Sequence, residues 1–118
     1  MEFVSKQQAY EATRKLLIEN AARWQDRRLE DVARNMAMDG DRSRDPDLYQ
    51  RFLDEITADP LSPQDALDAA AEFMQNTVGF DGQPEAAQLL ESAKITAEDP
   101  AKGDPALWSH WLDLLSRV

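Results

Sequence analysis

Three oxygen-bearing side chains stand at alternate positions from residue 39, as the first ligands of a helix–loop–helix calcium site do. They are Asp39, Asp41 and Ser43. Such a loop also needs glycine at its sixth position and a bidentate glutamate at its twelfth. These positions hold Arg44, which adds a repelling positive charge, and Gln50, which has no carboxylate. The pattern therefore predicts a loop that joins two helices and no calcium site.

Catalytic chemistry would have to use His110, the one histidine of the chain, because there is no cysteine. On a helix the neighbouring Ser109 would point about 100° away, which separates a nucleophile from its base. Zinc would need three carboxylates beside this single histidine, which is an uncommon ligand set. The chain has no glycine-rich phosphate loop and no nucleophile-elbow motif. We therefore predict no catalytic residue, no metal site and no cofactor.

Three acidic side chains fall on one face of a helix expected over residues 63–77, opposite its apolar stripe. One interpretation is a surface that recognises a partner or a magnesium ion. The other is a solvated helix face, on which acids near the N-terminus are favoured by the helix dipole. The candidates for partner binding are Asp65, Asp68 and Glu72, with Asp81 and Glu85 as weaker additions.

Charge is divided unevenly along the chain, whose formal net charge is −10. Residues 1–44 hold nine Lys/Arg and eight Asp/Glu, which gives a net charge of +1. Residues 45–118 hold four Lys/Arg and fifteen Asp/Glu, which gives a net charge of −11. An acidic body repels nucleic-acid phosphate, so we expect no nucleic-acid binding. It would attract a basic protein, although acidity can also serve solubility alone.

Arginines share one face of the N-terminal segment, and two of them follow a glutamate by four residues. The pairs are Glu19 with Arg23 and Glu30 with Arg34, in the order that favours ion pairing on a helix. A solvated face with salt bridges explains this pattern better than a phosphate-binding patch does.

The elements that position these groups are expected to be helices, because β-branched residues are sparse and no strand alternation is visible. Ser5 and Gln8 fit a capping box that starts a helical stretch over residues 6–38. Its two apolar stripes are offset by about a quarter turn. The stretch is therefore either one bent helix or two helices that meet near Gln25 and Asp26.

Glycine and proline mark the remaining helix ends. Gly40 is expected to stop the first stretch, and a capping side chain precedes a helix-starting proline at three later places. The predicted helices cover residues 46–57, 63–77, 84–96 and 105–117. Ile56-Thr-Ala-Asp-Pro recurs as Ile95-Thr-Ala-Glu-Asp-Pro. The recurrence indicates either a duplication that gave two acidic hairpins, 46–77 and 84–117, or a chance similarity between residues that end and start helices.

The fold prediction is a single helical domain over residues 1–118, a compact all-α bundle of five or six helices arranged as antiparallel hairpins. The expected core is Leu17, Trp24, Val32, Phe52, Ile56, Leu67, Phe73, Leu90, Trp108 and Leu112. The last helix carries more apolar side chains than one core-facing stripe needs. Its excess edge should pack on another helix or on a second copy of the chain, and a homodimer is one outcome. The candidates for self-association are Leu107, Trp111 and Leu114.

The leading hypothesis is a non-enzymatic acidic protein-binding domain, such as an immunity- or antitoxin-like inhibitor of a basic partner protein. The alternative is a small helical enzyme or ligand-binding protein that uses carboxylates from separate helices. The longest bulky apolar run has three residues, so no membrane span is expected. The absence of cysteine suits a reducing compartment, and we expect a cytoplasmic protein.

Overall fold

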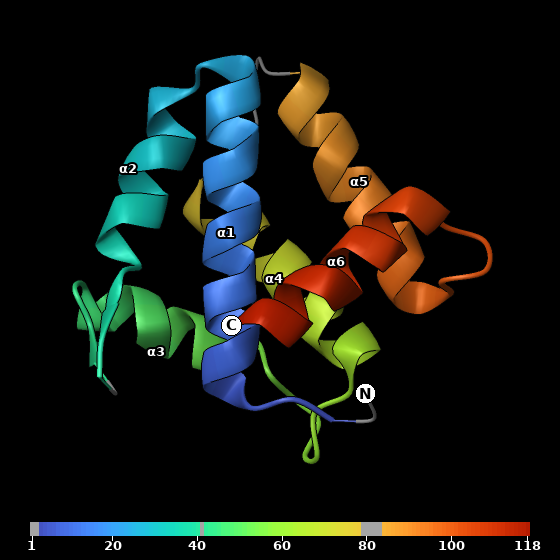
Figure 1. The fold of residues 1–118 in the computed structure, drawn as a ribbon, viewed down its shortest axis with the longest axis horizontal. Coiled ribbons are helices and arrows are strands. Elements are labelled where there is room, and N and C mark those ends of the chain that lie inside the picture. Colours follow the sequence, from blue (N-terminus) through green and yellow to red (C-terminus); the bar gives the residue numbers. More distant parts are fainter. Residues whose placement is uncertain (1–2, 41, 79–83) are drawn as a thin grey trace.

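The computed structural model describes residues 3–40, 42–78 and 84–118, and helices dominate these ranges (Figure 1). The helices are α1 Lys6–Trp24, α2 Arg27–Asn35, α3 Pro46–Asp54, α4 Pro63–Thr77, α5 Pro84–Glu98 and α6 Pro105–Arg117. The predicted all-α bundle of five or six helices is confirmed. The predicted proline-led starts at residues 46, 63, 84 and 105 are also confirmed.

Residues 6–38 form two helices that meet at the predicted place. The Ser5 hydroxyl accepts from the Gln8 backbone N–H at 2.9 Å, and the Gln8 side chain accepts from the Ser5 backbone N–H, which completes the capping box. Gln25 ends α1 in the left-handed region with φ 52°. The Asp26 carboxylate then accepts from the backbone N–H groups of Arg28 and Leu29 and starts α2.

The expected stop at Gly40 is wrong, because α2 ends at Asn35 and the chain continues into a short β-hairpin. Its strands are β1 Met38–Asp39 and β2 Arg42–Ser43, paired antiparallel. The returning segment supplies donors to the end of α2: the Asp45 backbone N–H and the Ser43 hydroxyl both donate to the Asn35 carbonyl. Gly40 has φ 67° and serves the hairpin turn instead.

The link from α3 to α4 is longer than predicted, since α3 ends at Asp54 and not at residue 57. The chain leaves the helix to run beside the N-terminus, where the Val4 backbone N–H donates to the Leu61 carbonyl at 2.8 Å. Ile56 therefore lies outside a helix, whereas its counterpart Ile95 lies inside α5. The two recurring segments are thus not structurally equivalent.

Helix pairing also differs from the two predicted hairpins. α2 runs back along α1, and α4 packs most extensively on α5, while α3 makes only a light contact with α4 (Figure 1). α6 crosses over α1, α4 and α5.

The turn into α6 is tight, because a methyl group on Gly103 would collide with Thr96. The Thr96 hydroxyl accepts from the Asp104 backbone N–H at 2.9 Å.

The core lies between α1, α3, α4 and α6. Rings of Tyr10, Tyr49, Phe52 and Phe73 pack there with centroid distances of 4.8–6.2 Å. Four predicted core side chains are fully buried, namely Leu17, Phe52, Leu67 and Phe73. The other six are half-buried, and all of them except Leu112 pack against the core, namely Trp24, Val32, Ile56, Leu90, Trp108 and Leu112. The radius of gyration, 13.0 Å, is that of one folded domain of this length.

Candidate functional site

Three predicted partner-binding residues lie together on α4. Ser62 caps this helix: its hydroxyl accepts from the Asp65 backbone N–H at 3.1 Å and donates to the Asp65 carboxylate at 2.9 Å. The apolar stripe of α4 turns inward with Leu67 buried, and the opposite side leaves Asp65 and Asp68 exposed. Helix periodicity therefore holds these carboxylates at the surface.

α5 adds a fourth carboxylate that the sequence did not indicate. Gln64 donates to the Glu98 backbone carbonyl at 2.9 Å, which brings the end of α5 to the start of α4. Glu98 thereby comes close enough to repel Asp68. We call Asp65, Asp68, Glu72 and Glu98 the acidic face. Lys94, also on α5, faces it with its Nζ 3.9 Å from Glu72 Oε1.

Asp68 is the electrostatic centre of the acidic face. Partial burial of its carboxyl raises its pKa, and repulsion from Glu72, Asp65 and Glu98 raises that pKa further. Lys94 acts in the opposite direction and lowers it, but the balance stays upward. The face therefore carries negative charge that a cation from another molecule would relieve.

The two weaker candidates do not join this face. Asp81 lies outside the described residues. Glu85 is in the first turn of α5, thirteen residues before Glu98, which corresponds to about 20 Å along a helix. It lines a separate groove.

The side chains expected at a self-association edge are covered by the chain itself. Trp111 has no exposed surface, and its indole N–H donates to the Pro63 carbonyl at 2.9 Å. Leu107 and Leu114 are also buried, with 9% and 3% of their surface exposed. The apolar excess of α6 packs on other helices of the same chain, which is the other outcome that its pattern allowed. A homodimer through these side chains stays a prediction, which their burial within one chain does not support.

The segment over residues 39–45 has a structural role. Asp39 and Ser43 lie on opposite strands of the hairpin, and Asp41 lies outside the described residues. The Ser43 hydroxyl is buried at 2.9 Å from the Tyr10 hydroxyl and donates to the Asn35 carbonyl. In the described parts of the chain, no three His, Asp or Glu side chains gather closely enough to hold a metal ion.

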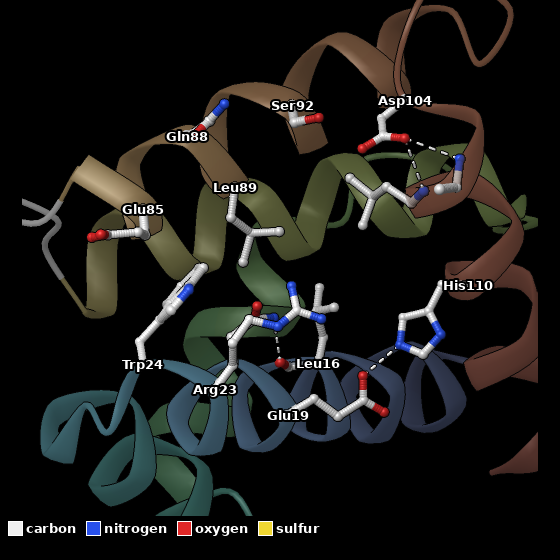
Figure 2. Close-up of a pocket in the computed structure, with 13 residues that line it drawn as sticks. Leu16, Glu19, Arg23, Trp24, Glu85, Gln88, Leu89, Ser92, Asp104 and His110 are labelled. Atoms are coloured by element: carbon white, nitrogen blue, oxygen red, sulfur yellow. Dashed lines mark hydrogen bonds and ion pairs between the residues drawn. The ribbon is translucent and has the colours of Figure 1, made fainter.

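A groove of about 490 Å³ opens between α1, α5 and α6 (Figure 2). His110 of α6 reaches across to Glu19 of α1 and forms a hydrogen-bonded pair with it. The ion pair predicted between Glu19 and Arg23 is therefore wrong. The ion pair predicted between Glu30 and Arg34 is confirmed, with 3.0 Å between Glu30 Oε1 and Arg34 Nη2. No sequence signal indicated the Glu19–His110 pair, because its members are 91 residues apart.

No protein-family model, curated protein or solved structure matches this chain. Within the described residues, no helix is both long and apolar enough to cross a membrane.

Proposed function

We propose that the protein is a non-enzymatic domain that binds a basic partner protein through the acidic face. The observation that carries this proposal is the crowding of three carboxylates from α4 and α5 around that of Asp68, against one lysine. The partner class that fits is a basic protein, such as a toxin that this chain would inhibit as immunity proteins and antitoxins do. We place this complex in the cytoplasm, since a chain with no cysteine suits a reducing compartment.

Two physical features support binding at this face. A positive side chain placed beside Asp68 would replace repulsion with attraction and lower the raised pKa of its carboxyl. The net charge of −11 over residues 45–118 would steer a basic partner from a distance. Association should accordingly be fast at low salt and slower as salt screens the charges.

The test begins with affinity capture of candidate partners from the source cells and continues with each purified pair. The variant Asp65→Asn/Asp68→Asn/Glu72→Gln removes three charges from the acidic face. We expect its association rate at low salt to fall by about tenfold or more, and its salt dependence to weaken. Surface plasmon resonance measures both quantities.

A matched control removes three charges elsewhere, through Asp31→Asn/Asp39→Asn/Asp47→Asn on α2, β1 and α3. This control should bind within about twofold of the unmodified protein, because close charge pairs matter more than net charge. An equal fall of the association rate in the two triple variants would show that binding depends on the overall charge of the protein. It would reject the acidic face as the site.

A further inference from the structure

The groove between α1, α5 and α6 has the size of a small-molecule site. Its volume of about 490 Å³ lies within the range of roughly 300–1,000 Å³ that such sites occupy. Leu16, Leu89 and Leu107 line it, one from each helix, and Trp24 adds an aromatic ring at the end of α1. Figure 2 shows the Trp24 ring extending from α1 toward α5.

Four of the eight polar side chains that line this groove already have partners. Glu19 pairs with His110, and the Asn20 amide donates to the Leu16 carbonyl at 2.8 Å. Asp104 accepts from the backbone N–H groups of Ala106 and Leu107 at the start of α6. Glu85 lies in the first turn of α5, where the helix dipole favours a negative charge.

Arg23 is an exposed lining residue that carries a positive charge without a partner, because its guanidinium forms no ion pair or hydrogen bond with any other residue that the structure describes. Glu19, its natural partner four residues earlier, is taken by His110 of the distant helix α6. Figure 2 shows the Arg23 side chain over the groove between Trp24 and Glu19. The guanidinium thus offers a planar fork of donors next to apolar surface.

We propose that this groove binds a small organic acid, with its carboxylate on Arg23 and its apolar body against Trp24 and the three leucines. The guanidinium matches a carboxylate in shape and charge and can donate two parallel hydrogen bonds to it. Glu19, Glu85 and Asp104 also line the groove and would repel an anion, so the carboxylate has to lie on the Arg23 guanidinium with the uncharged body of the ligand nearer these acids. A cationic ligand would be repelled by the unpaired positive charge of Arg23. This site is separate from the acidic face and does not depend on the function proposed for it.

The experiment is an NMR titration of backbone amide signals with phenylbutyrate and, in parallel, with the uncharged phenylbutyramide. We expect saturable shifts on the groove-facing turns of α1, α5 and α6, with the acid binding at least about tenfold more tightly than the amide. Arg23→Gln should weaken the acid by about tenfold and leave the amide unchanged. Ser92→Trp, which fills the groove from α5, should abolish binding of both compounds.

Arg42→Gln is the matched control, because it removes one exposed positive charge from the hairpin, away from the groove. It should leave the affinity for phenylbutyrate unchanged. The proposal is overturned by shifts that map elsewhere, by an affinity weaker than about 10 mM, or by equal affinity for acid and amide. It is also overturned if Arg23→Gln and Arg42→Gln weaken phenylbutyrate equally, or if binding survives in Ser92→Trp. A circular dichroism spectrum like that of the parent protein shows that each variant is folded.

Discussion

At the scale of single residues, Asp68 links charge to stability. Its carboxyl has a raised pKa in the folded protein, so the folded state holds this proton more tightly than the unfolded state, whose reference pKa is 3.8. The resulting stabilisation is present below pH 3.8 and is lost as the pH rises through the folded pKa. At neutral pH, ionised Asp68 therefore opposes folding.

Asp68→Asn should raise the free energy of unfolding at neutral pH by about 0.3–0.5 kcal/mol, a modest gain because solvent screens an exposed carboxylate. Aspartate and asparagine have similar helix propensities, so the change tests charge and not helix formation. Urea titrations measure the difference, which should vanish below pH 3.8. Asp39→Asn, outside the acidic face, serves as the control. An equal gain in that control would contradict the explanation.

Tyr10 should make the protein sensitive to alkali. Burial raises the pKa of its phenol from 10.0 to about 12, although the hydrogen bond to Ser43 lowers it. The protonated phenol is the form that the fold favours, so its stabilisation is complete below pH 10.0 and is lost as the pH rises toward about 12.

The Tyr49→Phe variant isolates this group, because the chain has two tyrosines. The ultraviolet absorbance of tyrosinate should appear near pH 12, together with loss of the helical circular dichroism signal. Titration near pH 10 in a protein that keeps its fold would show that Tyr10 is not buried in solution.

At the scale of elements, the turn between α1 and α2 depends on two adjacent residues with opposite expected effects. Asp26→Ala removes the carboxylate that accepts two N–H groups of α2 and should cost about 1 kcal/mol of unfolding free energy. Gln25→Gly should stabilise the protein by about 0.5 kcal/mol, because glycine adopts the left-handed conformation without strain.

Denaturant unfolding checks both values, with Asp31→Ala, an exposed position within α2, as the control. The control should change the unfolding free energy by less than about 0.5 kcal/mol. A loss in Asp31→Ala as large as that in Asp26→Ala would assign the effect to the helix in general and not to its cap.

At the scale of the whole molecule, α6 is an internal element that closes the core. Leu114→Glu would place a charge at a residue with 3% of its surface exposed, on a helix that packs against α1, α4 and α5. An unpaired buried charge costs more free energy than a domain of this size can spare. We therefore expect circular dichroism to show an unfolded chain.

Ser116→Glu, two positions along the same helix and exposed, should fold normally. The outcome also distinguishes a core helix from an interface. If Leu114→Glu folds and sedimentation shows that it halves the mass of a parent dimer, Leu114 lies between two copies and not inside one.

The sequence by itself determined where most helices begin and which face of α4 is acidic. Caps such as Ser5, Ser62 and Asp104 act on backbone groups two or three residues away, so their effect can be read locally. A shift of the apolar stripe indicated either a bend or a break near Gln25 and Asp26, and the structure shows the break. Periodicity alone also placed Asp65, Asp68 and Glu72 on one face, which is most of the acidic face.

Tertiary structure decided where α2 ends, because the donors that satisfy the Asn35 carbonyl come from the returning hairpin. It also brought Glu98 to the acidic face and His110 to Glu19, and it buried Leu114 inside one chain. These outcomes rest on contacts between residues far apart in sequence. A helical pattern fixes which side chains share a face, but the packing of the other helices decides what that face meets.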